Sequence, residues 1–409
     1  MLNLLPSEPR AALTHLLRWS LLASAVALLA GAASALFLFL LQRATALHGQ
    51  HPWLVWLLPL AGFAVGWIYL RIGSQVEAGN NLLLDEIRDP RATIPLRMAP
   101  LVLGATVVSH LFGASVGREG TAVQMGGALA DQLAHRLGLA AEERRLLLMT
   151  GISAGFASVF GTPMAGAVFG LEVLSIGCIN YAAMLPCLIA ALLADQTGLL
   201  LGIHHTHYAV AWIPPLSAWT ICATMIAGVL FGLTAMLFAR ATHAAGAAMK
   251  RWIAYPPLRP LCGGLLIALA AYCLPVQAYL GLGLPTIMAA FQQMLPPWDF
   301  FGKMIFTILS LGSGFKGGEV TPLFYIGATL GNALAPVLHL PFSFLAGLGF
   351  VAVFAGAANT PLASALMAME LFGAEIGIYA LLACVVSYAC SGHTGIYRAQ
   401  RVGQAKFST

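Results

Sequence analysis

The most unusual chemistry in the sequence is an arginine and a glutamate that stand side by side among glycines, small residues and apolar residues. This stretch reads GASVGREGTAVQMGG over 113–127 and contains Arg118 and Glu119. A second glycine-rich stretch, GSGFKGGEVTP over 312–322, contains Glu319. A buried carboxylate can hold a proton, and the backbone N–H groups of a glycine turn that opens a helix can bind an anion.

The composition indicates a membrane protein. Of the 409 residues, 59% are hydrophobic and 9% are charged, whereas soluble domains have about 45–50% apolar and about 25% charged residues. The first long apolar segment is too long for a cleaved signal peptide and indicates a retained span. Segment 163–174 is too short to cross a bilayer and predicts a broken helix. Five segments approach the roughly 20 residues that cross a bilayer core: 19–41, 52–70, 217–239, 261–276 and 376–390.

The sequence has no nucleotide motif, no catalytic triad and no metal-ligand spacing. Its seven cysteines are scattered through apolar segments without a Cys-x-x-Cys pair, so we expect neither a disulfide framework nor a zinc site. The stretch HHTH at 204–207 could suggest a metal. No acidic residue or cysteine stands close to it, so a polar loop between spans is the simpler interpretation. We expect no cofactor, no metal and no nucleic-acid partner.

Both glycine-rich stretches look like turns that open into apolar helices. The first N–H groups of a helix are unpaired and its N-terminus is electropositive, so such an end within the membrane can line a cavity and bind an anion. Glu119 is itself an anion, could occupy this site when it is empty, and would leave on protonation. In the simpler alternative Glu119 only pairs with Arg118. A membrane enzyme with Glu119 and Glu319 as acid and base is a weaker rival, because no nucleophile accompanies them.

Two blocks of sequence recur in the same order. GREGTAVQMGGA at 117–128 matches GGEVTPLFYIGA at 317–328 with an offset of 200 residues. TPMAGAVFGLE at 162–172 matches TPLASALMAME at 360–370 with an offset of 198 residues. Two matches with nearly equal offsets predict that the chain consists of two related halves.

We predict one transmembrane domain over 1–409 that contains two repeats, 1–205 and 206–409. Lysine and arginine gather near the N-terminus, in a central segment around 240–259 and near the C-terminus, whereas the loop at 201–216 has neither. Because cytoplasmic loops carry the excess of these residues, we expect both termini in the cytoplasm and the loop outside. Each half then crosses an odd number of times. Inverted repeats around a shared central site are typical of transporters.

These motifs resemble the CLC family of chloride channels and anion/proton antiporters. GREGTAVQ is similar to the family's Gly-Arg-Glu-Gly-Pro signature, with Thr121 in place of proline, and GSGFKGGEVTP, GTPMAGAVFGLE and YLGLG resemble three further blocks. The resemblance covers nearly the whole chain. It implies an all-α polytopic membrane protein with the CLC fold and broken helices, and a homodimer in which each subunit is an inverted repeat with its own anion pathway. It also implies that Glu119 is the gating glutamate and that the Tyr397 hydroxyl faces the central anion.

Departures from the usual pattern resemble the fluoride/proton antiporter branch of the family. Asn80 takes the position of a serine that donates to the anion in chloride-transporting members, and Val173 takes the position of their inner proton-path glutamate. Glu319 and Thr321 also match the fluoride branch. An asparagine amide offers two donors where serine offers one. The resemblance therefore implies fluoride export from the cytoplasm in exchange for protons across a bacterial inner membrane. A chloride/proton antiporter or an anion channel of the same fold is the alternative.

Several residues have a second interpretation. Asn80 and Asn81 could cap the helix that follows them, and both roles can hold at once. Lys303 and Lys316 either add positive potential to the pathway or snorkel. Besides lipid, we expect fluoride or chloride, protons and a second copy of the chain as partners. The candidate site comprises Glu119 and Glu319 for gating and protons, Asn80, Gly117, Arg118, Glu319, Val320, Thr321 and Tyr397 for the anion, and Asn81, Phe315 and Lys316 in support.

Overall fold

The chain folds almost entirely into α-helices. The computed structural model describes residues 7–407. The helices up to the central loop are α1 (Ser7–Gln50), α2 (Leu58–Ile68), α3 (Asn80–Arg88), α4 (Met98–Leu111), α5 (Glu119–Arg136), α6 (Ala141–Phe160), α7 (Pro163–Glu172) and α8 (Met184–Leu200). The later helices are α9 (Ala218–Trp252), α10 (Leu258–Cys273), α11 (Leu284–Gln292), α12 (Asp299–Ser313), α13 (Val320–Leu338), α14 (Phe342–Ala358), α15 (Pro361–Phe372) and α16 (Gly377–Cys390).

Short turns and one pair of two-residue strands complete the fold. The short helical turns are η2 (Pro52–Leu57), the π-helical η3 (Tyr69–Gly73), η4 (Ser74–Val76), η5 (Tyr181–Ala183), η6 (Gln277–Tyr279) and η7 (Ala374–Ile376). Strand β1 (Ser175–Ile176) pairs in parallel with β2 (Arg401–Val402), and Ser175 lies opposite Arg401. This pairing places the C-terminal segment beside the end of α7.

Helix lengths agree with a membrane protein that has both complete and broken spans. By length and composition, five helical stretches of the described chain can cross a bilayer: Ala12–Gln50, Pro52–Arg88, Tyr181–Leu200, Ala218–Trp252 and Val320–Leu338. The ten residues of α7 extend only about 15 Å at 1.5 Å per residue, half of a hydrocarbon core of about 30 Å. The prediction that segment 163–174 is too short to span is therefore confirmed. The polar ends of such a helix require protein rather than lipid around them.

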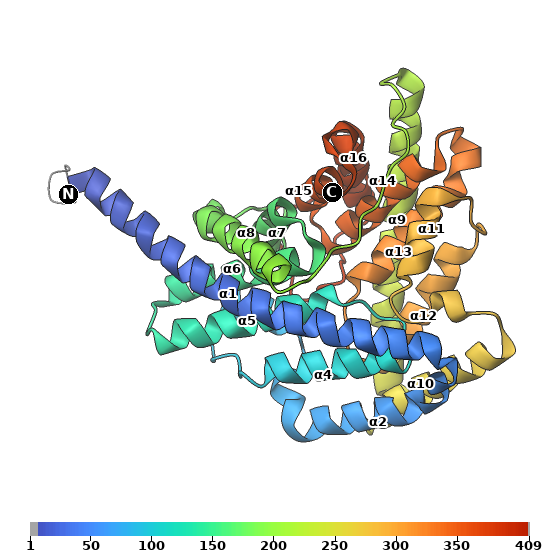
Figure 1. The fold of residues 1–409 in the computed structure, drawn as a ribbon, viewed down its shortest axis with the longest axis horizontal. Coiled ribbons are helices and arrows are strands. Elements are labelled where there is room, and N and C mark those ends of the chain that lie inside the picture. Colours follow the sequence, from blue (N-terminus) through green and yellow to red (C-terminus); the bar gives the residue numbers. More distant parts are fainter. Residues whose placement is uncertain (1–6, 408–409) are drawn as a thin grey trace.

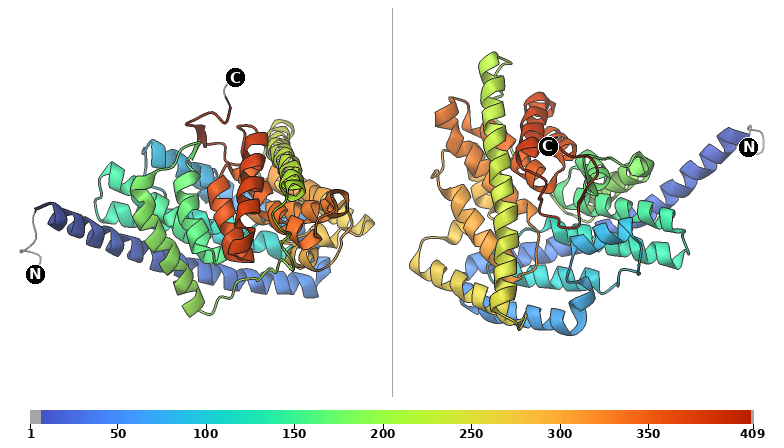
Figure 2. Two further views of the ribbon diagram at one scale, coloured as in Figure 1. Left: turned by 90° about the horizontal axis from the view of Figure 1, so that it is seen from above. Right: turned by 180° about the vertical axis from the view of Figure 1, so that it is seen from behind.

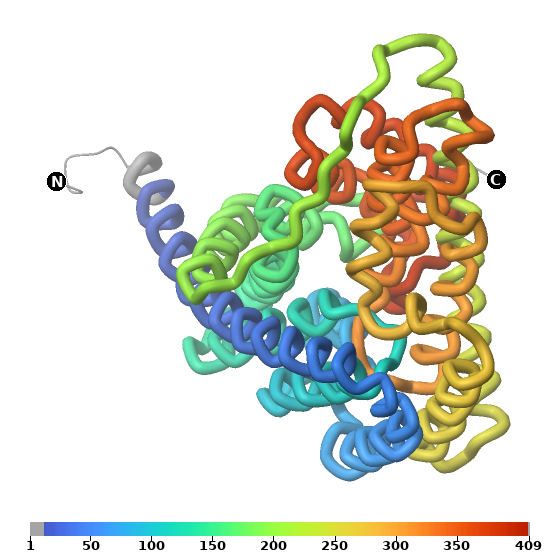
Figure 3. Tube along the Cα trace, turned by 45° about the vertical axis from the view of Figure 1, so that its right-hand side comes forward, coloured from blue at the N-terminus to red at the C-terminus, as the bar shows by residue number. Residues whose placement is uncertain are grey.

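The chain forms two helical groups that lie side by side. Figure 1 shows the helices up to α8, in blue to green, next to those from α9 onward, in yellow-green to red. The views in Figure 2 show the long α1 along the first group and the long α9 along the second. Between α8 and α9 the chain has neither helix nor strand, and Figure 3 shows an extended trace there. This segment coincides with the loop that the sequence predicts at 201–216.

Facing glycines allow the central helices to pack closely. Between α13 and α14, a Cβ atom on Gly327 would lie 2.0 Å from the carbonyl oxygen of Gly349. Between α5 and α6, a Cβ atom on Gly126 would lie 2.2 Å from the carbonyl oxygen of Gly151. Small residues permit such approaches, and van der Waals packing is a main attraction between helices in lipid. Many of the 43 glycines therefore serve helix packing as well as turns.

Two carboxylates connect the short helices α7 and α15. Glu172, the last residue of α7, accepts hydrogen bonds of 2.9 and 3.1 Å from two backbone N–H groups in the first turn of α15. Glu370 in α15 accepts two hydrogen bonds of 2.8 Å from backbone N–H groups in the first turn of α7. Each carboxylate thus satisfies donors that a helix N-terminus leaves unpaired. The two contacts are reciprocal and join the two helical groups.

Candidate anion and proton site

The two glycine-rich stretches meet through their backbones. Gly117 N donates to Gly318 O at 2.5 Å, and Gly318 N donates to Gly117 O at 2.8 Å, which forms an isolated antiparallel bridge. Helix α5 begins at Glu119 and α13 begins at Val320, so both helices start beside this bridge. The unpaired N–H groups of two helix ends therefore lie close together, in the arrangement that the sequence predicts for an anion site.

The Glu119 side chain occupies the N-terminal end of α13. Its Oε1 accepts a hydrogen bond from the Thr321 hydroxyl at 2.5 Å, and its Oε2 accepts one from Thr321 N at 3.1 Å. Oε2 also accepts a hydrogen bond from Arg118 N at 3.1 Å. Glu119 is 1% exposed, so water does not compete for these donors. A carboxylate thus takes the place expected for an anion, and its charge strengthens each of these hydrogen bonds.

Arg118 lies beside this carboxylate as a secondary partner. Its Nε is 3.5 Å from Glu119 Oε1, a distance that qualifies as an ion pair. The same nitrogen is buried and makes no hydrogen bond to any described residue, so the contact is electrostatic only. The alternative in which Glu119 only pairs with Arg118 is wrong, because Thr321 supplies two hydrogen bonds.

Helix α3 places two asparagines at its first two positions. Gly79 precedes them with a φ of +58°, a conformation that favours glycine. The helix has no side-chain cap, so the capping interpretation of Asn80 and Asn81 is wrong. Asn81 Oδ1 instead accepts a hydrogen bond of 2.9 Å from Ala399 N. Asn80 Nδ2 lies 3.0 Å from where a Cβ atom on Gly120 would stand, and its Oδ1 is buried without a partner among the described residues.

A small cavity lies between Asn80 and Tyr397. Its volume is about 10 Å³, which is about the space that one water-sized sphere needs. Val173 lines the same cavity, so the position that the resemblance assigns to an inner glutamate is an apolar part of its wall. Two polar side chains within an otherwise apolar wall suit a single small anion. The remaining lining residues are Leu83, Leu84, Val123, Ile152 and Phe169.

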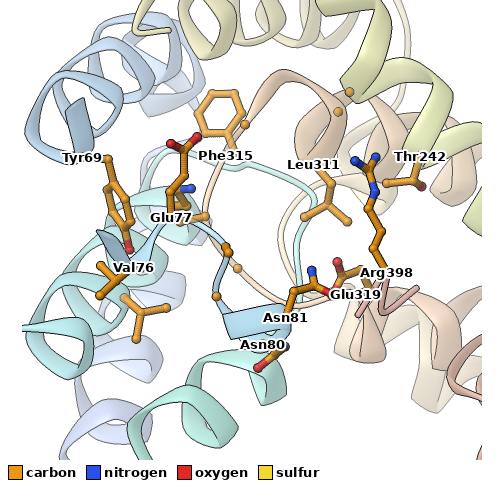
Figure 4. Close-up of a pocket in the computed structure, with 18 of the residues that line it drawn as sticks. Tyr69, Val76, Glu77, Asn80, Asn81, Thr242, Leu311, Phe315, Glu319 and Arg398 are labelled. Atoms are coloured by element: carbon orange, nitrogen blue, oxygen red, sulfur yellow. The ribbon is translucent and has the colours of Figure 1, made fainter. Parts of the chain in front are cut away.

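A second cavity, here called the vestibule, connects this region with the surface. Its volume is about 1060 Å³, and both Asn80 and Tyr397 line it. Figure 4 shows Asn80, Asn81, Glu319 and Arg398 among its lining side chains. Glu319 is partly buried and is the N-cap residue of α13. The N-terminal end of this same helix binds the Glu119 carboxylate. Glu319 therefore lies at the wall of a cavity that opens to the surface.

The predicted supporting residues hold the loop that precedes α13. Phe315 is 5% exposed, and its ring fills the space beside Gly62, where a Cβ atom would lie 2.8 Å from it. Lys316 Nζ lies 4.3 Å from the centroid of the Tyr69 ring, and both residues line the vestibule. These contacts connect the loop with α2 and η3. They also place the Lys316 charge beside the vestibule, in agreement with a contribution to its positive potential.

Sequence reasoning did not identify several polar partners. Lys303 is 0% exposed and donates hydrogen bonds to the carbonyl oxygens of Tyr279 and Gly281, at 3.1 and 2.6 Å, so the snorkelling interpretation is wrong for it. In the HHTH stretch, His205 Nε2 lies 3.3 Å from Asp195 Oδ1. The described residues contain no group of three or more histidine, cysteine, aspartate or glutamate side chains suited to a metal. No local spacing signals these pairs, because each joins separate helices or loops.

Comparison with known proteins agrees with this geometry. A curated relative from Pseudomonas syringae pv. tomato, described as "Chloride/fluoride channel protein", is 63% identical over 400 residues, which cover 96% of this chain and 88% of the relative. The fold matches a crystal structure of a CLC-type fluoride/proton antiporter with a TM-score of 0.92 and 35% identity, over 95% of this chain and 98% of the other.

A more distant structure shares the fold alone. It is a slow cyanobacterial chloride/proton antiporter, which matches with a TM-score of 0.80 and 20% identity over 93% of this chain and 96% of the other. The sequence profile of the family described as "Voltage gated chloride channel" matches residues 61–392. On these grounds, together with the paired helix ends around Glu119, the chain belongs to the CLC family of anion transport proteins.

Proposed function

We propose that this protein exports fluoride from the cytoplasm in exchange for protons. The observation that carries the proposal is the Glu119 carboxylate bound to the amide and hydroxyl of Thr321 at the start of α13. Donors that hold a carboxylate also suit a small inorganic anion. Glu119 and fluoride therefore compete for one set of donors, to which the amides of Glu319 and Val320 also belong.

Protonation decides whether Glu119 keeps these donors. The ionised carboxylate accepts charge-assisted hydrogen bonds, whereas the protonated form loses its charge and much of its accepting capacity. A proton that reaches Glu119 from outside releases the side chain from Thr321, and a fluoride ion takes its place. When Glu119 loses that proton toward the cytoplasm, the carboxylate returns and displaces the anion outward. Exchange follows because one site cannot hold both anions.

Glu319 provides the inner part of the proton route. It lines the vestibule together with Asn81 and Tyr397, and it directly precedes α13. Val173 offers no carboxylate at the position where the resemblance places an inner glutamate. Glu319 therefore stands between vestibule water and the donors that hold Glu119, and it can transfer a proton between them.

Fluoride is favoured over chloride by the donors beside the small cavity. The cavity of about 10 Å³ lies between Asn80 and Tyr397 and has room for a single small ion. Fluoride is strongly hydrated, so its binding requires compact donors that replace its water, and an asparagine amide supplies two. The Arg118 side chain adds positive charge nearby. The similar solved protein at 35% identity is described as a fluoride/proton antiporter.

A chloride antiporter or an anion channel of the same fold is the second candidate. The observation that favours it is the description of the 63% identical relative, which names a channel and both halides. A channel needs no proton transfer, so it would conduct anions at a rate that is independent of a proton gradient. The proposals therefore differ in proton coupling and in halide preference.

Reconstitution in liposomes separates these functions. Vesicles loaded with sodium fluoride are diluted into fluoride-free buffer, while a fluoride electrode records efflux and a trapped pH dye records protons. We expect fluoride efflux to drive proton uptake against a proton gradient, and matched chloride vesicles to show much slower flux. Fluoride flux without proton uptake indicates a channel, and equal chloride flux contradicts the fluoride preference.

We further propose that residues 1–205 and 206–409 are inverted repeats of one domain, and that the protein is a homodimer in the bacterial inner membrane. In support, a long helix opens each half, α1 and α9, and the short helices α7 and α15 exchange the reciprocal contacts of Glu172 and Glu370. Both termini are proposed to be cytoplasmic, although the ends themselves, 1–6 and 408–409, lie outside the described residues. Crosslinking in liposomes and protease access to terminal tags test the dimer and the orientation.

A further inference from the structure

We propose that Gln400 is a positioning residue that fixes Tyr397 against Asn80 at the anion site. The inference rests on the proposed function and extends it to a residue that does not touch the anion. Gln400 follows Tyr397 by three residues and lies in the C-terminal segment that is neither helix nor strand before β2. Gln400 N donates a hydrogen bond of 3.2 Å to Tyr397 O, which closes a turn between the two residues.

The Gln400 side chain connects three separate parts of the chain. Its Nε2 donates to Val173 O at 2.9 Å and to Ala358 O at 3.0 Å. Its Oε1 accepts a hydrogen bond of 2.9 Å from Asn359 Nδ2. These partners stand at the end of α7, at the end of α14 and directly after α14. Both amide hydrogens and the amide oxygen of this half-buried side chain are used, and such hydrogen bonds to three separate parts of the chain favour one rigid arrangement.

The backbone on both sides of Tyr397 is also held. Ile396 N donates to Ala357 O at 2.8 Å, and Ala399 N donates to Asn81 Oδ1 at 2.9 Å. The tyrosine therefore lies between two fixed backbone contacts, and Gln400 adds the contact to α7. Asn81, which the sequence suggests as a supporting residue, acts on the same segment from the side of α3.

Gln400 contacts two residues that line the small cavity, Val173 and Tyr397. Val173, whose carbonyl oxygen accepts from Gln400, lines the cavity of about 10 Å³ together with Asn80 and Tyr397. Binding sites require their groups within about 0.5 Å of the productive geometry. In a cavity this small, loss of the Gln400 contacts shifts both the tyrosine and the opposite apolar wall. The consequence is weaker anion binding without a direct effect on Glu119.

The substitution Gln400→Leu tests this role, because it keeps a side chain of similar volume and removes every polar contact of the Gln400 side chain. In reconstituted vesicles we expect the KM for fluoride to rise about tenfold, the change in an equilibrium constant that loss of about one net hydrogen bond produces. The maximum rate should change far less, because Glu119 and its donors are untouched. Gln50→Leu, at an exposed position at the end of α1, is the matched control.

A double mutant distinguishes positioning from a general structural effect. If Gln400 acts through Tyr397, Gln400→Leu should leave the KM of Tyr397→Phe almost unchanged, since residues that act through one contact are not additive. The inference is overturned if the rise in KM of the double mutant equals the product of the rises in the two single mutants. It is also overturned if the KM of Gln400→Leu does not change. If Gln400→Leu does not fold, Asn359→Gly replaces it. Glycine fits the φ of +57° there and frees Gln400 Oε1, so the KM should again rise.

The wild-type protein separates this inference from the proposed function. Absence of fluoride-driven proton uptake in wild-type vesicles contradicts the antiporter function. The positioning role of Gln400 is then tested by the same comparison of KM between wild type and Gln400→Leu. In that case the KM values are measured for the anion that wild type conducts. A raised KM in Gln400→Leu then supports positioning at the site of that anion, and an unchanged KM refutes it.

Discussion

The backbones of Gly117 and Gly318 hydrogen-bond to each other in both directions, at 2.5 and 2.8 Å. This bridge joins the loops that precede α5 and α13, so two helix N-termini lie beside one another. Each N-terminus offers unpaired N–H groups and positive potential. Glu119 belongs to the first helix and binds to the end of the second. The bridge therefore determines which donors the Glu119 carboxylate meets.

Substitution of Gly318 tests whether the site depends on this bridge. In Gly318→Ala the new Cβ atom would lie 2.9 Å from Gly120 N, a backbone atom that cannot move as a flexible side chain can. Such overpacking costs about 1–3 kcal/mol, so we expect a lower thermal unfolding temperature and almost no fluoride transport. Gly104→Ala in α4 is the control, because nothing lies within 4 Å of a Cβ atom there. Normal transport by Gly318→Ala contradicts a need for the bridge.

The Thr321 hydroxyl should matter more than its methyl group. Thr321→Val keeps the size and the backbone N–H but removes the donor that lies 2.5 Å from Glu119 Oε1. A hydrogen bond to a charged group contributes about 1.5–3 kcal/mol, so we expect the rate of coupled exchange to fall at least tenfold. Thr321→Ser keeps the hydroxyl and should transport at nearly the wild-type rate. Equal rates for the two variants in the fluoride-electrode assay contradict this role.

Asn80 should control the choice between halides. Asn80→Ser retains one hydroxyl donor in place of two amide donors and widens the cavity beside Tyr397. We expect the ratio of fluoride flux to chloride flux to fall about tenfold, which corresponds to roughly one net hydrogen bond. Parallel efflux measurements with the two halides determine this ratio. If the ratio does not change, selectivity arises elsewhere in the pathway.

A buried ion-pair network away from the site should control stability instead. Arg144 Nε lies 2.5 Å from Asp131 Oδ1, and Arg144 Nη2 lies 3.3 Å from Glu86 Oε2, with all three side chains at most 15% exposed. Arg144→Met leaves two buried carboxylates without this partner, which costs about 3–5 kcal/mol. We expect a clear fall in the thermal unfolding temperature. Arg91→Met, which breaks an exposed pair with Asp89, should leave that temperature unchanged, and equal effects contradict the argument.

The sequence predicts the helices and the meeting of the two glycine-rich stretches well. Long apolar segments dictate helices in a membrane, and the recurrence of a glycine, a glutamate and a threonine matches Glu119 with Glu319 and Thr121 with Thr321. Both signals are local, so they can be read without a structure. The two hydrogen bonds between Thr321 and Glu119 follow from the fold, which brings the two glycine-rich stretches together.

Side-chain partners across the fold could not be predicted in the same way. Asparagine is a common helix-capping residue, and two asparagines stand at the start of α3. Asn81 instead accepts a hydrogen bond from Ala399 N, because the C-terminal segment returns to α3. Lys303 is of a residue type that often snorkels, yet its ammonium donates hydrogen bonds to the carbonyl oxygens of Tyr279 and Gly281 before α11. Gln400 has no local signal at all, since its three partners lie far from it in sequence.

The most direct test of the central claim is proton uptake driven by a fluoride gradient in vesicles that contain Glu119→Gln. Glutamine keeps the size of the side chain but carries neither the charge nor the proton that exchange requires. We expect wild-type vesicles to take up protons against a gradient as fluoride leaves, and Glu119→Gln vesicles to show no coupled proton uptake at all. Undiminished proton uptake by Glu119→Gln would contradict competition between this carboxylate and the anion.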